Sequence, residues 1–180
     1  MPNGRKTGLK MRVYESRFEG AVLLVHQRIK GIWAAQSLAT GGRLTRVAGR
    51  YKNSTTDSLL SLALVSGLQS ISAKRVQILT ESLGGRKPKI QVMCGNPSFI
   101  EAFSAENTKP LFINSYIIDK LKRLRDRFDL CFEYIDPQSQ PVGALTTWAV
   151  TNVMVDGDIM PCVLSVLGRQ EHKADCNIAF

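Results

Sequence analysis

Three strand candidates follow one another over residues 21–27, 31–38 and 44–51. The first opens with an uninterrupted apolar run, as expected of a strand that is buried on both faces. The last two are joined by Thr-Gly-Gly at residues 40–42, and glycine takes the positive φ angles of tight turns at little cost. Because short connections join antiparallel neighbours, this pattern predicts an antiparallel meander. A further strand is predicted to end near Glu15, before a break over residues 16–20.

A helix is predicted to follow the meander. Residues 53–57 read Asn-Ser-Thr-Thr-Asp, and their side-chain oxygens can accept hydrogen bonds from the free N–H groups at a helix start. The apolar residues that come next form a stripe wide enough to pack on a sheet: Leu59, Leu60, Leu62, Ala63, Leu64 and Leu68. We therefore predict a helix over residues 55–71, with a continuation toward Leu83.

Strand and helix patterns alternate in the second half of the chain. Strands are predicted over residues 89–94 and 130–135, and helices over residues 98–103 and 114–128. Gly95, Asn96 and Pro97 stop the first of these strands, because this composition is typical of turns. Beyond residue 137 the pattern is less regular, with strand-like stretches over 146–155 and 160–167.

Length and composition predict one domain with its own core. The chain has 180 residues, of which 44% are hydrophobic and 22% charged, as in ordinary globular domains. We expect a flexible basic arm over residues 1–10, a core over 11–136, and a C-terminal extension over 137–180 packed on that core. The apolar runs are too short to cross a bilayer, and the four cysteines form no metal or disulfide motif. We therefore expect a cytoplasmic or nucleoplasmic protein that is neither secreted nor membrane-bound.

The positive charge is concentrated in the first third of the chain. Residues 1–52 hold eleven lysines and arginines and two acids, which accounts for the whole net charge of +9. A localised positive field attracts phosphate backbones, and it equally attracts an acidic protein surface. The candidate nucleic-acid-binding residues are the basic side chains of this part: Arg12, Arg17, Arg43, Arg46, Arg50 and Lys52.

The order of these elements resembles that of the ribonuclease H superfamily over about residues 11–136. The resemblance implies an α/β fold with a mixed five-stranded sheet, built from three antiparallel strands, a helix, a strand, a helix and a strand, with a C-terminal extension. It rests on that order and on local matches around Val13-Tyr-Glu-Ser16, residues 53–57, Cys94-Gly-Asn-Pro97 and Glu171-His-Lys-Ala-Asp175.

The resemblance implies a catalytic position in each match. In that family, carboxylates at the first strand, the first helix, the fourth strand and the last helix hold two Mg²⁺ ions for phosphodiester cleavage. The corresponding residues here are Glu15, Asp57, Asn96 and Asp175. Asn96 offers an oxygen without charge, and Glu15 is one methylene longer than Asp, so the set is weakened for ions that demand strict octahedral geometry. His26 and His172 are interpreted as structural or exposed.

Three functions remain open from the sequence. The first is a non-catalytic binding or assembly protein, without metal cofactor, whose basic third engages nucleic acid or an acidic protein partner. The second is a divergent nuclease or junction resolvase that holds Mg²⁺ or Mn²⁺ with Glu15, Asp57, Asp175 or Asp136. The third is a protein-protein adaptor that uses exposed strand edges and the C-terminal third. The weakened carboxylate set favours the first, with a protein partner expected and nucleic acid as the other candidate.

Overall fold

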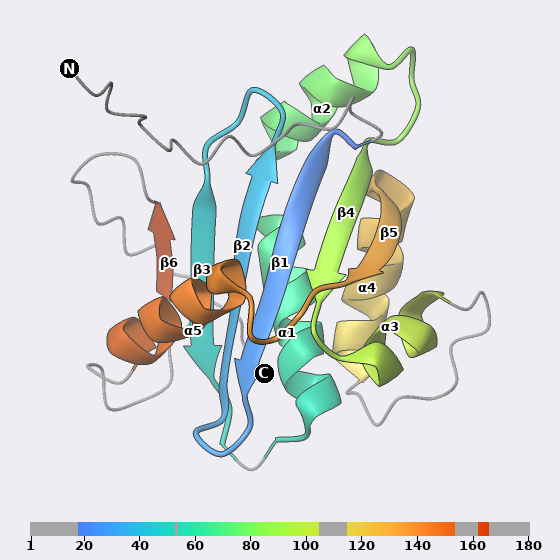
Figure 1. The fold of residues 1–180 in the computed structure, drawn as a ribbon. Coiled ribbons are helices and arrows are strands. Elements are labelled where there is room, and N and C mark those ends of the chain that lie inside the picture. Colours follow the sequence, from blue (N-terminus) through green and yellow to red (C-terminus); the bar gives the residue numbers. More distant parts are fainter. Residues whose placement is uncertain (1–17, 53, 105–114, 154–161, 166–180) are drawn as a thin grey trace, which may run out of the picture.

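The computed structural model describes residues 18–52, 54–104, 115–153 and 162–165. This part of the chain forms a six-stranded mixed sheet in the order β5-β4-β1-β2-β3-β6 (Figure 1). Its strands are β1 (Gly20–Gln27), β2 (Ile32–Ala39), β3 (Thr45–Arg50), β4 (Lys89–Cys94), β5 (Asp129–Tyr134) and β6 (Cys162–Ser165). The meander of β1, β2 and β3 is antiparallel, whereas β4 and β5 extend it in parallel to β1. At the other side, β6 pairs antiparallel with β3.

Helices cover both faces of the sheet. They are α1 (Thr56–Gln69), α2 (Ala73–Ser82), α3 (Pro97–Ser104), α4 (Ser115–Arg127) and α5 (Gln140–Val153). Helices α1 and α4 lie behind the sheet in the view of Figure 1, and α5 crosses in front of it. No helix within the described residues is long and apolar enough to cross a membrane.

The main core lies between the sheet and α1. The hydroxyl of Thr55 accepts a hydrogen bond from the backbone N–H of Ser58 at 3.2 Å and so begins the helix. Nearly every side of α1 is apolar, because the helix is enclosed by the sheet on one side and α4 on the other. Leu60 and Leu64 are fully buried in one cluster with Leu24 of β1. Each such leucine contributes roughly 1.5–3 kcal/mol relative to an exposed position.

The second face of the sheet is covered by α5. Three helix residues at a spacing of four, Leu145, Ala149 and Val153, pack on the sheet residues Leu23, Val25, Ile32, Ala34 and Ala48. The strand predicted over residues 146–155 is therefore wrong. Threonine, valine and tryptophan in this stretch favour a strand locally. The helix forms because its apolar stripe packs on the sheet and is buried there.

The predicted mixed architecture of three antiparallel strands extended by two parallel ones is confirmed, and β6 adds a sixth strand within the stretch expected at residues 160–167. The helix predicted over residues 55–71 is confirmed, but its continuation toward Leu83 is wrong. Helix α1 ends at Gln69 with Ser70 as its C-cap, and Ser72 is the N-cap of a separate helix, α2. The strand near Glu15 and the basic arm lie outside the described residues, and the domain limits remain a prediction.

Candidate functional site

Four strands end at the same edge of the sheet, the carboxyl edge. Strands β1, β4 and β5 are parallel to one another, and β3 shares their direction because two antiparallel pairings separate it from β1. Helix α1 starts at this edge, where the arrowheads of β1, β3 and β4 point in Figure 1. In open α/β sheets, ligands bind where the carboxyl ends of parallel strands meet, so this edge is the first candidate site.

His26 and Asp57 lie together at the carboxyl edge. Val22 and Leu24 of β1 pack in the cluster on the α1 face, and alternation places His26 on that same face. Burial lowers the pKa of His26, whereas the nearby negative charge of Asp57 raises it in part. Burial is the larger of the two effects, so His26 is a neutral imidazole at neutral pH.

Asn96 and Asp136 follow the ends of β4 and β5 and are engaged in local structure. The Oδ1 atom of Asn96 accepts a hydrogen bond from the backbone N–H of Phe99 at 2.9 Å and caps α3. The Oδ1 atom of Asp136 accepts one from the backbone N–H of Gln138, also at 2.9 Å. Burial raises the pKa of the Cys94 thiol to about 11, which leaves this cysteine protonated and a poor nucleophile.

The structure brings two of the four sequence-predicted catalytic positions to this edge. Asp57 stands in the first turn of α1, and Asn96 follows β4. Glu15 and Asp175 lie outside the described residues, so their assignment remains a prediction. From the sequence, His26 was interpreted as structural or exposed and not as a site residue, because the first catalytic position was assigned to a separate strand ending at Glu15. The sequence signal that could have identified His26 is its position directly after the apolar run of β1, the strand that pairs in parallel with β4.

The described side chains at this edge do not by themselves fit a pair of divalent metal ions. Within the described residues, no three His, Cys, Asp or Glu side chains gather where they could hold a metal ion. The last described helix, α5, contains neither Asp nor Glu in its sequence. Two divalent ions at roughly 3.5–4 Å repel each other strongly and need several carboxylates for neutralisation. Here Asp57 faces a neutral histidine, and Asn96 contributes no charge.

The basic side chains named as nucleic-acid candidates do not form one surface. The Nε atom of Arg46 donates to Oε1 of Gln36 at 2.8 Å, and its guanidinium lies 5.6 Å from the ring centroid of Trp148 in α5. Arg43 lies beyond the other end of β3, in the turn between β2 and β3. Arg50 and Lys52 lie at the carboxyl edge, whereas Arg12 and Arg17 are outside the described residues.

Four basic residues gather at the carboxyl edge, and we call this group the basic edge: Arg28, Lys30, Arg50 and Lys52. Arg28 and Lys30 are exposed in the turn between β1 and β2, and they were missed as candidates from the sequence. The Nε atom of Arg50 donates to the carbonyl oxygen of Lys30 at 3.0 Å. The backbone N–H of Tyr51 donates to the Gly31 oxygen at 2.7 Å, so the turn is fastened to the end of β3.

Gly31 makes this close approach possible. Its φ is 64°, and a Cβ atom there would stand 2.5 Å from the carbonyl oxygen of Tyr51. A side chain would therefore push the turn away from β3. Ile29, at the tip of the turn, is 99% exposed and adds an apolar contact point beside the basic edge.

The fold is similar to those of solved ribonucleases H. The LC11 ribonuclease H1, in a complex with an RNA/DNA hybrid, matches with a TM-score of 0.52 at 12% identity, over 74% of this chain and 97% of that chain. The N-terminal ribonuclease H domain of Rv2228c from Mycobacterium tuberculosis, solved as a fusion with maltose-binding protein, has a TM-score of 0.47 at 14% identity, over 77% and 99% of the two chains. No protein-family model and no curated protein matches the sequence. The structural match to the LC11 enzyme shows that the chain has a ribonuclease H-like fold.

Proposed function

We propose that this protein is a non-catalytic binding protein with a ribonuclease H-like fold, and that its basic edge engages the phosphate backbone of nucleic acid. One observation carries the proposal. At the carboxyl edge of the sheet, four basic residues lie on a turn and a strand end that are hydrogen-bonded to each other, at the same edge as His26, Asp57 and Asn96. This arrangement suits attraction of phosphates and does not suit neutralisation of metal ions.

The charge of the described residues at this edge supports a non-catalytic role. A pair of Mg²⁺ ions brings four positive charges, and the protein and the substrate phosphate must offset them. Asp57 supplies one negative charge, and Asp136 supplies another that is already oriented by the backbone N–H of Gln138. The neutral state of His26 leaves it able to hydrogen-bond but not to replace a carboxylate.

Nucleic acid is the partner that the basic edge fits best. Lysine and arginine side chains on neighbouring turns can contact successive phosphates, and such contacts release counterions without reading sequence. The similar LC11 ribonuclease H1 was solved with an RNA/DNA hybrid, which makes such a hybrid the first ligand to test. An acidic protein partner remains the competing ligand for the same charges.

Binding can be tested by fluorescence anisotropy with a labelled RNA/DNA hybrid over a salt series. The variant K30Q/K52Q removes two exposed charges of the basic edge, whereas the control K122Q/R123Q removes two exposed charges of α4. We expect the basic-edge variant to bind hybrids of any sequence more weakly. The slope of log affinity against log salt concentration should fall by about one for each lost phosphate contact. Equal loss in both variants would contradict the basic edge, and a salt-insensitive lack of binding in the wild type would favour a protein adaptor.

Catalysis can be tested on the same hybrid, on duplex and on branched DNA with Mg²⁺ or Mn²⁺. We expect the nucleic acids to stay intact at protein concentrations that saturate binding. Metal-dependent cleavage that is abolished by Asp57→Asn and by Glu15→Gln would overturn the proposal and establish a divergent nuclease. Cleavage that survives both changes would indicate a contaminating nuclease, and a repeat after further purification would remove it.

A further inference from the structure

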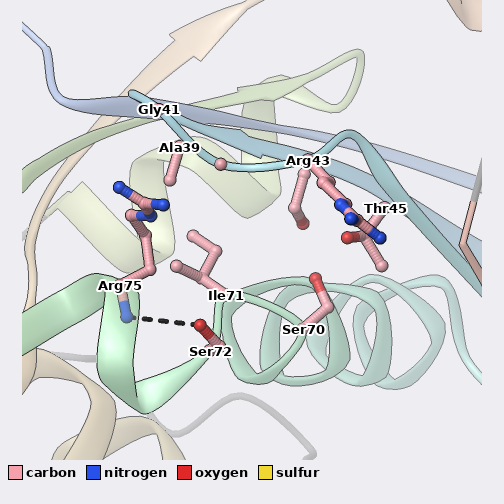
Figure 2. Close-up of a pocket in the computed structure, with 10 residues that line it drawn as sticks. Ala39, Gly41, Arg43, Thr45, Ser70, Ile71, Ser72 and Arg75 are labelled. Carbon is pink, nitrogen blue, oxygen red and sulfur yellow. Dashed lines mark hydrogen bonds between the residues drawn. The ribbon is translucent and has the colours of Figure 1, made fainter. Parts of the chain in front are cut away.

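A polar hollow lies at the opposite edge of the sheet from His26 and Asp57. It is a pocket of ≈310 Å³ between the turn that joins β2 to β3 and the junction of α1 with α2 (Figure 2). Figure 2 shows Arg43 and Arg75 on two sides of it, with Ser70, Ile71 and Ser72 along its floor. The pocket shares no residue with the basic edge.

The charge of this pocket is positive and uncompensated within the described structure. Its lining includes two arginines and no Asp or Glu. Within the described part of the chain, neither the Arg43 nor the Arg75 guanidinium has a hydrogen-bond or ion-pair partner. Arg75 is half-buried and Arg43 exposed. Two guanidinium groups on one small hollow repel each other, so an anion between them would be stabilised.

The absence of a side chain at Gly41 leaves room for the guanidinium of Arg75. A Cβ atom at Gly41 would stand 2.9 Å from Nη1 of Arg75, and the φ of Gly41 is 68°. The guanidinium therefore lies directly on the glycine turn, in space that a side chain would occupy.

The hydroxyl groups of the pocket divide into two kinds. Ser37 and Ser70 donate to the carbonyl oxygen of Gly67 at 2.7 and 2.6 Å, so their protons are already used in the fold. Ser72 accepts from the backbone N–H of Arg75 at 3.2 Å, which leaves its own proton available. Thr45 lines the pocket and has no side-chain hydrogen bond to the rest of the described chain. Ser72 and Thr45 can therefore donate to a ligand.

We propose that this pocket binds a phosphate group, with Arg43 and Arg75 as its charged ligands and the Ser72 and Thr45 hydroxyls as further donors. A phosphate offers several acceptor oxygens and one to two negative charges, which match two planar guanidinium forks better than a single carboxylate does. The phosphate comes from a small phosphate ester or from a nucleic-acid strand. The site stands independently of the proposed function, because it lies at the other edge of the sheet.

Phosphate binding can be measured by isothermal titration calorimetry with inorganic phosphate, against chloride at equal ionic strength. We expect R43Q and R75Q each to lower the affinity roughly tenfold or more, as for loss of a charge-assisted hydrogen bond. Thr45→Val should lower it several-fold, and the α4 control R123Q should leave it unchanged. Equal phosphate affinity in the wild type and in R43Q/R75Q, or no binding beyond that of chloride, would overturn the site.

A parallel titration with a single-stranded oligonucleotide distinguishes the two sources of the phosphate. If a strand supplies it, R43Q/R75Q weakens binding of both the oligonucleotide and inorganic phosphate. If a small ester supplies it, the double variant loses inorganic phosphate and adenosine monophosphate but keeps the oligonucleotide. Failure of the proposed function is recognised separately. In that case K30Q/K52Q binds the RNA/DNA hybrid as tightly as the wild type does, and the phosphate titrations of the wild type and of R43Q/R75Q keep their expected difference.

Discussion

The two edges of the sheet differ in how their polar groups are used. At the carboxyl edge, Asn96 caps a helix and Asp136 orients a turn, while His26 is half-buried and neutral at neutral pH. At the opposite edge, Arg43 and Arg75 line a pocket without partners among the described residues. Polar groups that are satisfied within the fold contribute to stability, whereas unsatisfied charged groups are available to a ligand. His26, Asn96 and Asp136 are thus the more structural polar groups, whereas Arg43 and Arg75, like the exposed lysines of the basic edge, are available to a ligand.

The largest expected effect comes from giving the carboxyl edge the charges it lacks. The variant H26D/N96D adds two further carboxylates to the edge where Asp57 lies, and their repulsion and burial should lower the free energy of unfolding by roughly 2 kcal/mol. Mn²⁺ should recover this loss in the variant, by about 2.7 kcal/mol at one hundred times its dissociation constant, and should not stabilise the wild type. Thermal unfolding with and without Mn²⁺ checks both. Stabilisation of the wild type by Mn²⁺ that Asp57→Asn removes would contradict the comparison.

A smaller effect is expected from removing the cap of α3. Asn96→Ala leaves the Phe99 N–H without its acceptor and should cost about 1 kcal/mol in urea unfolding. Asn96→Ser keeps a capping oxygen and should stay within a few tenths of a kcal/mol of the wild type. If both variants are as stable as the wild type, Asn96 is not structural, and its place at the carboxyl edge needs a functional reason.

The protonation of His26 gives a pH-dependent effect. Because burial lowers its pKa in the folded state, the unfolded chain binds a proton there more readily. The free energy of unfolding should therefore fall as the pH drops below about 6.5, the usual histidine value, and level off below the folded-state pKa. Comparison of urea unfolding across this range with His26→Gln, which should lack this slope, isolates the contribution. The same substitution at His172 serves as the control.

Substitution of Asp57 tests the interaction between Asp57 and His26 directly. Its negative charge raises the pKa of His26 against the larger effect of burial, so Asp57→Asn should lower that pKa further. A histidine titration followed by NMR measures the shift directly. An unchanged His26 pKa in the variant would mean that the two side chains do not interact in solution.

The smallest stability effect is expected at the opposite edge. Because Arg43 and Arg75 lack partners in the described structure, R43Q/R75Q should change the free energy of unfolding by no more than about 0.5 kcal/mol in phosphate-free buffer. Phosphate should then stabilise the wild type but not the variant. A large loss of stability without phosphate would show that the arginines serve the fold and would remove the contrast between the two edges.

The sequence predicted the parts of the fold in which local pattern and tertiary packing agree. The apolar runs of β1 and β4 and the leucine stripe of α1 have one stable outcome, and all three appear near their predicted bounds. Helix α5 was predicted as a strand because threonine and valine favour strands, and only the small alanines of the sheet face explain why a helix fits there. In such stretches the neighbouring surface, rather than the local sequence, decides the structure.

The candidate site was predictable to a smaller extent. Asp57 and Asn96 were found because the resemblance to the ribonuclease H superfamily aligns them with catalytic positions, whereas capping and turn chemistry alone would not have singled them out. His26 was missed because its meaning depends on the parallel pairing of β1 with β4, which joins segments far apart in the chain. Arg75 was not considered at all, since only the turn between β2 and β3 places it opposite Arg43 in one pocket.

The pairing of distant segments also has a consequence for the order of folding. The turn after β1, the end of β3 and the phosphate pocket all come from one continuous stretch between residues 28 and 75. Contacts within such a stretch close short loops and form quickly, whereas the β1–β4 pairing and the Thr45–Ser165 pairing close long ones. Amides of the meander should gain protection from hydrogen exchange first and those of β6 last. The charged binding features would then exist on a nascent chain before Asn96 joins His26 and Asp57 at the carboxyl edge.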